Sequence, residues 1–181
     1  MGLKFLDQAL RDVYLIEPET FIDERGLFRR HFCRREFADH GIDMEVKQAN
    51  VSENPRAHTL RGLHFQRPPF GEGKILSCLK GAIHDVIVDL RAESPTYLHW
   101  TSVELSDRNR LSVYLPPGCA NGWMTTEPET WIHYYHSEVY QPRAEGGIRY
   151  NDPFFGFAWP AEPAVISEKD RTYPDFNPER T

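Results

Sequence analysis

Short apolar segments separated by glycine and proline run through this sequence from end to end. The chain has 12 glycines and 14 prolines, and they fall between segments in which apolar and polar residues often alternate with a period of two. Long stretches with apolar residues at helical spacing are missing. The pattern therefore predicts an all-β fold, a jelly roll (double-stranded β-helix) or barrel, with only short helices at its periphery.

The expected elements form one domain over residues 1–181. Strands are expected over 12–18, 28–32, 44–52, 59–65, 74–81, 83–91, 99–105, 111–116 and 130–140. A short helix is expected around 34–41, and turns near 106–110 and 115–122. In the segment 83–90, the even-numbered residues from Ala82 to Leu90 are expected to form the apolar face. The polar, proline-containing segment 173–181 is expected to form a loose tail.

Composition excludes several classes of protein. Apolar residues make up 40% and charged residues 27% of the chain, which fits neither a disordered nor a membrane protein. The net charge of −6, with scattered basic residues, argues against nucleic acid as the main partner. Cys33, Cys78 and Cys119 lie too far apart for a disulfide framework or a zinc knuckle. No secretory signal is recognised, so a cytoplasmic enzyme or binding protein is expected.

Several predicted strands carry ionisable side chains among apolar neighbours, where a small barrel should be apolar. Three of these side chains are of chemical interest. Each has a structural interpretation: His64 as a buried structural histidine, Lys74 as a solvated strand end, and Tyr134 as part of an aromatic wall. Together they supply a base, a cation and a weak acid. Lining one cavity, they would be able to abstract a proton next to a carbonyl group.

The sequence does not favour a metal site. His64 is followed by Phe65 and Gln66 rather than by a second histidine, and the later turn has Asn121 at the position where a metal site needs a ligand histidine. His133 and His136 are three residues apart on a predicted strand, so their side chains point to opposite faces. No metal and no cofactor are therefore expected, and the simplest chemistry is acid–base catalysis by side chains.

A series of motifs, in a characteristic order and spacing, extends from about Val13 to Asp170. These motifs are 21-FIDERGLF-28, 48-QAN-50, 59-TLRGLHFQ-66, Lys74, 81-GAIHDVIVDLRAESPTY-97, 115-LPPGCANGW-123, 147-GIRYNDPFFGFAW-159 and 167-SEKD-170. With them the chain resembles the dTDP-4-dehydrorhamnose 3,5-epimerase family of cupin-like sugar-nucleotide epimerases. The resemblance implies a homodimer in which an N-terminal strand joins the partner's sheet.

The resemblance also implies a catalytic set. Its reaction would be the inversion of carbons that flank C4 in a nucleotide-linked 4-keto-6-deoxyhexose, at a site without metal. The base of the family corresponds to His64, and the aspartate that holds it corresponds to Asp170. The lysine near the enolate oxygen corresponds to Lys74, and the tyrosine on the opposite face of the sugar to Tyr134.

The same resemblance implies a set of substrate-binding residues. Arg25 and Arg61 would bind the pyrophosphate, because the planar guanidinium group can bond its oxygens bidentately. Phe21 and Tyr140 correspond to the aromatic residues that sandwich the nucleobase. Gln48 and Asn50 correspond to polar residues that line the site.

Several residues depart from the family pattern. Arg30 stands where the family has a glutamate near the nucleobase. An arginine donates hydrogen bonds, which suits the acceptors of cytosine and suggests CDP; alternatively, Arg30 faces solvent or a phosphate. Asn121 replaces a histidine, Trp123 replaces a phenylalanine, and 131-WIHYYH-136 adds His133 and Tyr135. These changes are expected to surround the sugar pocket.

Alternative functions remain at this point. One is a single-site epimerase that acts at C3 or C5 of a CDP-linked 4-keto-deoxy sugar. Others are a sugar-nucleotide ketoisomerase and a non-catalytic nucleotide-sugar binding module. The four residues of the catalytic set argue against a binding module, which has no need of a base and a distal acid.

Overall fold

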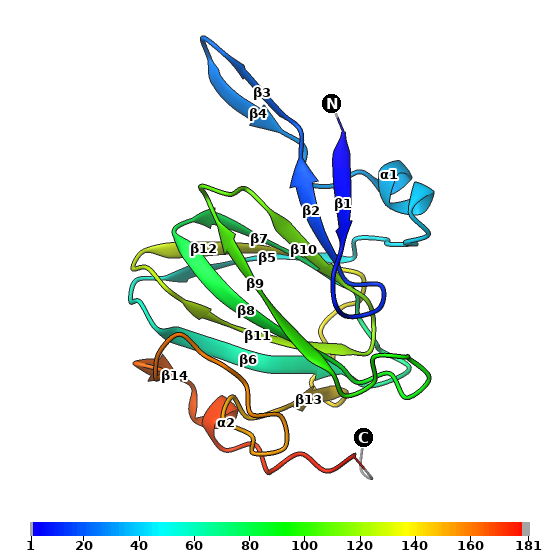
Figure 1. The fold of residues 1–181 in the computed structure, drawn as a ribbon, viewed down its shortest axis with the longest axis vertical. Helices are drawn as coiled ribbons and strands as arrows, with labels where there is room; N and C mark the ends of the chain where they lie inside the picture. Colours follow the sequence, from blue (N-terminus) through cyan, green and yellow to red (C-terminus); the bar gives the residue numbers. More distant parts are fainter. Residues whose placement is uncertain (1, 179–181) are drawn as a thin grey trace.

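Two sheets packed face to face form the body of the protein (Figure 1). The computed structural model describes residues 2–178. The first sheet has the order β1 (Leu3–Asp7), β2 (Tyr14–Pro18), β10 (Ser112–Leu115), β7 (Lys74–Lys80), β12 (Thr130–His136) and β5 (Gln48–Asn54). The second has the order β13 (Glu145–Gly147), β6 (Thr59–Gln66), β11 (Cys119–Thr125), β8 (Ala82–Asp89) and β9 (Trp100–Ser106), and β14 (Val165–Ile166) pairs with β6. This arrangement confirms the all-β expectation.

The remaining elements are small. The strands β3 (Thr20–Asp23) and β4 (Gly26–Arg29) form a hairpin that projects away from the two sheets (Figure 1). The helices α1 (Arg34–Asp39) and α2 (Glu168–Arg171) are short and peripheral, as expected. Within residues 2–178 there is no helix that is long and apolar enough to cross a membrane.

Each expected strand overlaps an observed one, but several boundaries were wrong. The expected strand over 44–52 begins at Gln48, and the one over 130–140 ends at His136. The expected strand over 28–32 ends at Arg29, and the chain then leaves the hairpin toward α1. The expected turn over 115–122 is shorter, because β11 begins at Cys119 and runs on through Asn121. Pro116, Pro117 and Gly118 make the turn itself, and the small residues after them pair with β8.

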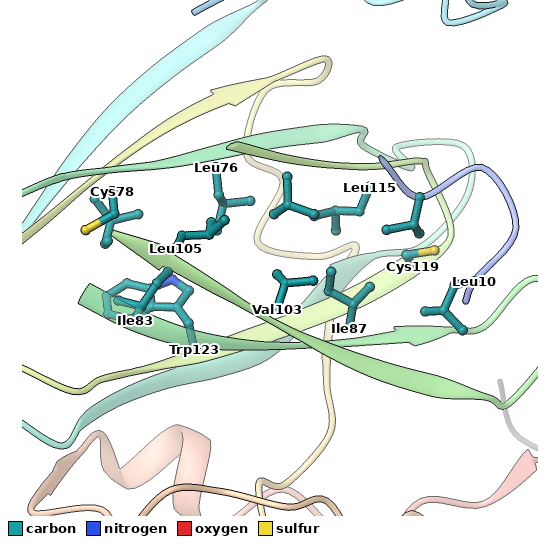
Figure 2. Close-up of a cluster of buried hydrophobic side chains, with 13 residues drawn as sticks. Leu10, Leu76, Cys78, Ile83, Ile87, Val103, Leu105, Leu115, Cys119 and Trp123 are labelled. Carbon is teal, nitrogen blue, oxygen red and sulfur yellow. The ribbon is translucent and has the colours of Figure 1, made fainter. Parts of the chain in front are cut away.

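The core lies between the two sheets (Figure 2). Its buried residues come from both sheets and from the loop after β1: Leu10, Val13, Leu76, Cys78, Ile83, Ile87, Val103, Leu105, Val113, Leu115, Cys119, Trp123 and Ile132. Strand β8 also buries its other face, where Val86 and Val88 pack against Ile148 and Phe155. The expectation of a single apolar face was therefore wrong, because the chain after β13 covers the outside of this sheet.

The described part of the expected tail, residues 173–178, is anchored to the body. The Tyr173 carbonyl accepts a hydrogen bond from Arg149 at 3.1 Å, and the Phe176 amide donates one to Asp152 at 2.7 Å. The Phe176 ring packs against Phe155, with centroids 4.9 Å apart. Residues 179–181 lie outside the described part of the chain.

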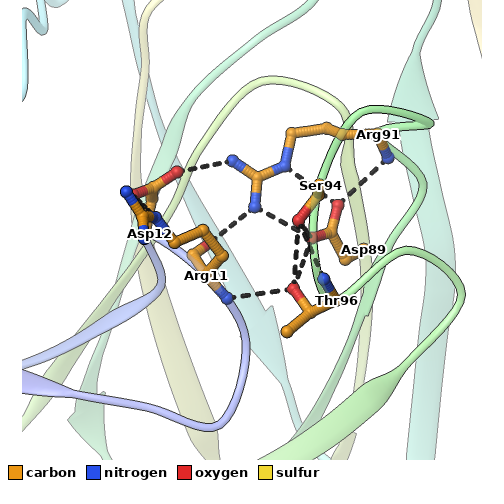
Figure 3. A network of polar contacts seen from close by, with 6 residues as sticks. All are labelled: Arg11, Asp12, Asp89, Arg91, Ser94 and Thr96. Atoms are coloured by element: carbon orange, nitrogen blue, oxygen red, sulfur yellow. Dashed lines mark hydrogen bonds and ion pairs between the residues drawn. The ribbon is translucent and has the colours of Figure 1, made fainter.

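A polar network joins the loop after β1 to the loop after β8 (Figure 3). Arg91 donates two hydrogen bonds of 2.9 Å to Asp89 and one of 2.9 Å to Asp12. Ser94 and Thr96 complete the shell of donors around Asp89. Burial raises the pKa of Asp89, but these bonds outweigh it and hold the pKa below its usual range. Gly118 makes room for this network, since a Cβ there would lie 2.6 Å from the Arg91 side chain.

Replacing Arg91 with alanine is expected to lower the free energy of unfolding by about 3 kcal/mol, because it leaves the fully buried Asp89 without its cation. The control is Arg108→Ala, whose exposed ion pair with Glu127 should contribute less than about 1 kcal/mol. Denaturant titration measures both. Since the Asp89 pKa is depressed, this stabilisation is present at neutral pH and fades as pH falls below about 4. An equal decrease in the free energy of unfolding of the two variants would contradict the role given to Arg91.

Candidate active site

A cavity of about 750 Å³ opens between the two sheets at the end where β6, β7 and β12 meet the segment 165–170. Nine of the predicted catalytic and substrate-binding residues line it: Gln48, Asn50, Arg61, His64, Lys74, Asn121, Tyr134, Tyr140 and Asp170. They come from five strands, from α2 and from the segment after β12. The volume suits a ligand of nucleotide-sugar size.

His64 and Asp170 form a hydrogen-bonded pair at this cavity. The Asp170 Oδ1 atom lies 2.7 Å from His64 Nε2, and Oδ2 accepts a bond from the Gly62 amide at 3.2 Å. Ser167 caps α2 by accepting a bond from the Asp170 amide, which fixes the start of the helix. Because Asp170 accepts from two directions, it holds the proton of His64 on Nε2 and leaves the Nδ1 lone pair as the basic nitrogen.

The environment keeps Asp170 ionised. Burial raises the pKa of its carboxyl group, but the hydrogen bond from His64 and those from Gly62 and Ser167 outweigh burial and lower the pKa. Glycine is required at position 62 by the close approach of β6 to β11. Gly62 has a φ of +108°, and a Cβ there would lie 2.6 Å from the Gly122 backbone.

Lys74 lies beside this pair with its ammonium group buried. Its Nζ atom lies 3.2 Å from the His64 carbonyl oxygen, 3.2 Å from Asn121 Oδ1 and 3.4 Å from Glu72 Oε1. The residue is only 5% exposed. A fixed cation of this kind stabilises a negative oxygen that develops on a substrate.

Tyr134 lies on β12, on the strand face that points into the cavity. Its ring centroid is 6.4 Å from that of Trp123 and 5.8 Å from that of His136. Burial raises the pKa of the Tyr134 phenol, so the group keeps its proton at neutral pH. Arg61 extends over the Trp123 ring and donates a hydrogen bond to Asn54 at 3.1 Å.

Asn121 joins Lys74 to a buried carboxyl group. Its Nδ2 atom donates to Asp85 Oδ1 at 3.1 Å, while its Oδ1 accepts from Lys74. Burial raises the pKa of Asp85 to about 7, against the opposing effects of Asn121 and Lys74. The Asp85 Oδ2 atom has no hydrogen-bond partner among residues 2–178.

Five ionisable residues in or behind the cavity lining were not predicted as site residues: Glu72, Asp85, His136, Glu145 and Lys169. The alternating pattern of residues 130–140 predicted that His136 shares a strand face with Tyr134, but the only role considered for His136 was that of a metal ligand. Glu145 accepts a hydrogen bond from the Tyr140 hydroxyl at 2.7 Å and pairs with Lys169. No sequence motif indicates that Tyr140, Glu145 and Lys169 come together, because their contacts form only in the folded chain.

Three predicted binding residues lie outside the cavity of this chain. Phe21 and Arg25 belong to the projecting β3–β4 hairpin, where Phe21 is 62% exposed and Arg25 pairs with Asp23. Arg30 follows the hairpin and forms an ion pair with Glu36 on α1.

The expectation that all departures from the family pattern surround the sugar pocket was wrong for two residues. His133 and Tyr135 point to the other face of β12, because they alternate with Tyr134 along the strand. There His133 contacts His31, and Tyr135 packs against Phe32. Asn121 and Trp123 do line the cavity.

The donor atoms in the described chain do not suggest a metal centre. Across residues 2–178, no group of three or more histidine, cysteine, aspartate or glutamate residues is arranged to hold a metal ion. The site therefore consists of hydrogen-bonded acids, bases and amides.

Comparison with known proteins gives one family. The family model for dTDP-4-dehydrorhamnose 3,5-epimerase matches residues 7–178. The epimerase of that name from Methanothermobacter thermautotrophicus is 40% identical over 173 residues, which cover 94% of this chain and 92% of that protein.

Two solved structures are similar over nearly the whole chain. The dTDP-4-dehydrorhamnose 3,5-epimerase of Bacillus anthracis, with TDP and PPi bound, has a TM-score of 0.93 at 35% identity and covers 97% of this chain and 100% of that one. A 3'-monoepimerase from Streptomyces bikiniensis, in complex with dTDP-quinovose, has a TM-score of 0.86 at 30% identity. The match covers 93% of this chain and 85% of that one. These likenesses confirm the expected cupin-like fold. The chain belongs to the dTDP-4-dehydrorhamnose 3,5-epimerase family and is a carbohydrate epimerase.

Proposed function

We propose that this protein inverts the carbons that flank the C4 ketone of a dTDP-linked 4-keto-6-deoxyhexose. One observation carries the proposal: the His64–Asp170 pair, with a 2.7 Å hydrogen bond, lies in one cavity beside the buried Lys74 ammonium. A carbon-bound proton next to a ketone becomes removable only when a base and a stabiliser of the enolate oxygen act together.

The proposed mechanism uses four side chains. The Nδ1 atom of His64 takes the proton from carbon, the C–H electron pair forms the enolate, and the negative oxygen is stabilised by Lys74. Asp170 stabilises the imidazolium ion that results. Tyr134 then donates its phenol proton to the opposite face of the carbon, the ketone forms again, and the configuration is inverted.

The nucleotide is proposed to be dTDP. The Bacillus anthracis structure contains TDP, and the Streptomyces bikiniensis structure contains dTDP-quinovose. The cytosine hypothesis depended on Arg30, and in this chain that guanidinium is engaged in an ion pair with Glu36 on α1. Free cysteines at positions 33, 78 and 119 fit a reducing compartment, and we place the reaction in the cytoplasm.

Isotope exchange tests the proposed reaction and substrate. The wild-type protein is incubated in D₂O with 4-keto-6-deoxyglucose linked either to dTDP or to CDP, and proton NMR follows each ring position. We expect deuterium at C3, C5 or both of the dTDP-linked sugar, at a higher rate than for the CDP-linked sugar. Loss of the proton signals identifies the carbons that react. Absence of exchange with either substrate would refute the proposed function, and a preference for CDP would refute the nucleotide assignment.

We also propose that the protein is a homodimer in which the β3–β4 hairpin completes the site of the partner. The hairpin carries exposed apolar side chains, among them Ile22 at 70% and Phe28 at 64% exposure. Apolar groups so exposed on a projecting hairpin favour burial against another surface. Phe21 and Arg25 would then reach the nucleotide in the second subunit's cavity.

Mixing two inactive variants tests this exchange of hairpins. An Arg25→Ala protomer and a His64→Asn protomer, refolded together, should form mixed dimers with one intact site. Random pairing of a symmetric dimer predicts recovery of about a quarter of wild-type activity. Each variant refolded alone is the control. If activity does not return although light scattering shows mixed dimers, the hairpin acts within its own chain or not at all.

A further inference from the structure

The Lys74 ammonium group has no donor left for a substrate. An ammonium group carries three N–H bonds, and three protein oxygens lie within reach of Nζ: the His64 carbonyl, Asn121 Oδ1 and Glu72 Oε1. The side chain is 7% exposed. An enolate oxygen that is to be stabilised by Lys74 must therefore replace one of these three acceptors.

Two of the three acceptors are poorly suited to leave. The His64 carbonyl belongs to the backbone of β6, which is paired on both sides. Asn121 is fixed from behind by Asp85, at 3.1 Å. Glu72 makes the longest contact with Lys74, 3.4 Å, and its other carboxylate oxygen has a second partner, so Glu72 can release Lys74 and still be hydrogen-bonded.

That second partner is His136. Its Nδ1 atom lies 2.9 Å from Glu72 Oε2, and Asn50 lies 3.3 Å from its Nε2. An ionised carboxylate only accepts hydrogen bonds, so Nδ1 carries the proton that it donates to Glu72. Burial raises the pKa of Glu72, but His136 and Lys74 outweigh burial and keep the pKa below its usual range.

The backbone fixes these residues relative to one another. His136 lies directly opposite Lys74 in the pairing of β12 with β7. Gly73 and Ser137 exchange hydrogen bonds of 2.9 and 2.7 Å just beyond this pair. The side chains of Glu72 and His136 are only 11% and 13% exposed. A Glu72 carboxylate that lost both partners would be a buried, unpaired charge, which is strongly unfavourable.

We propose that His136 is a positioning residue that holds Glu72, so that Lys74 can exchange this carboxylate for the oxygen of the substrate. This inference rests on the proposed function, because it needs an enolate oxygen at Lys74. In the resting site Glu72 accepts hydrogen bonds from both Lys74 and His136. When negative charge develops on the substrate, Lys74 turns to it, and Glu72 stays bonded to His136. The residue acts through Glu72 and Lys74 and does not itself touch the reacting carbon.

The test compares two replacements of His136 in steady-state kinetics. The Nδ2 atom of asparagine occupies nearly the position of the imidazole Nδ1, so His136→Asn keeps the donor to Glu72 and should retain kcat within about threefold. His136→Phe keeps the ring but removes the donor. Because Glu72 then depends on Lys74 alone, kcat should fall at least about tenfold with little change in KM. His133→Phe, on the opposite face of the same strand, is the control and should match the wild type.

A second replacement tests the connection through Glu72. Adding Glu72→Gln to His136→Phe removes the charge that retains Lys74, so the double variant should recover most of the lost kcat. Recovery is not expected if His136 only supports the fold. Where His136→Phe does not fold, His136→Gln serves instead, since its amide lies at the Nε2 position and away from Glu72.

The experiments distinguish a failure of the proposed function from a failure of the role proposed for His136. A wild-type protein without isotope exchange would refute the proposed function. An active wild type together with a His136→Phe variant of equal kcat, or a double variant without recovery, would refute the role of His136 alone. Binding of dTDP to each variant, measured by calorimetry, confirms that the compared proteins are folded.

Discussion

Asp170→Asn is expected to lower kcat by about 10⁴-fold while the protein stays folded. The Gly62 amide needs an acceptor at 3.2 Å, so the asparagine oxygen turns toward Gly62 and its NH₂ group faces His64. The imidazole must then accept a hydrogen bond at Nε2 and carry its proton on Nδ1. The nitrogen that should remove the substrate proton is thereby already protonated.

Nitrogen-15 NMR of His64 provides a direct check of this tautomer. The wild type should show the proton on Nε2, and Asp170→Asn should show it on Nδ1. Glu168→Gln, an exposed carboxylate in the same helix, is the matched control and should leave both the spectrum and kcat unchanged. An Asp170→Asn variant with normal turnover would rule out the base assignment.

Lys74→Met is expected to lower kcat by about 10²- to 10³-fold, the loss typical of removing a stabiliser of a developing oxyanion. Methionine fills a similar volume, and Glu72 keeps its hydrogen bond to His136, so the fold should tolerate the change. The slow step should then be proton removal, which a primary deuterium isotope effect on kcat reveals.

Lys80→Met is the control for this change. It removes a lysine from the other end of β7, where the side chain is exposed over the Trp131 ring. Its kcat should equal that of the wild type. If both lysine variants lost activity equally, the effect would come from the protein's overall charge, and Lys74 would have no specific role at the enolate.

Much of the fold was predictable because local pattern decides it. The strand that contains His64 and the strand that contains Tyr134 each combine β-branched or aromatic residues with an alternating pattern, and both begin at the expected residue. Strand β11 was not recognised because Cys119, Ala120, Asn121 and Gly122 are small residues that usually mark turns. They form a strand here because β6 and β8 flank them on both sides.

The site was predictable to the extent that motifs carried it. His64, Lys74 and Tyr134 were singled out as ionisable residues in predicted strands, the family resemblance gave them roles and added Asp170, and the cavity brings the four together. Glu72, Asp85 and His136 could not be found in this way. Their roles arise from burial and from partners distant in the sequence, and a single acidic residue or histidine in a strand looks the same whether it faces solvent or a cavity.

The central claim is that His64, held by Asp170 and beside Lys74, removes a proton from carbon. The most direct measurement is the rate of deuterium incorporation from D₂O into the dTDP-linked 4-keto sugar, compared between the wild type and His64→Asn. We predict exchange by the wild type and a rate at least about 10³-fold lower for His64→Asn, with dTDP binding retained. Exchange at the wild-type rate in His64→Asn would contradict the account.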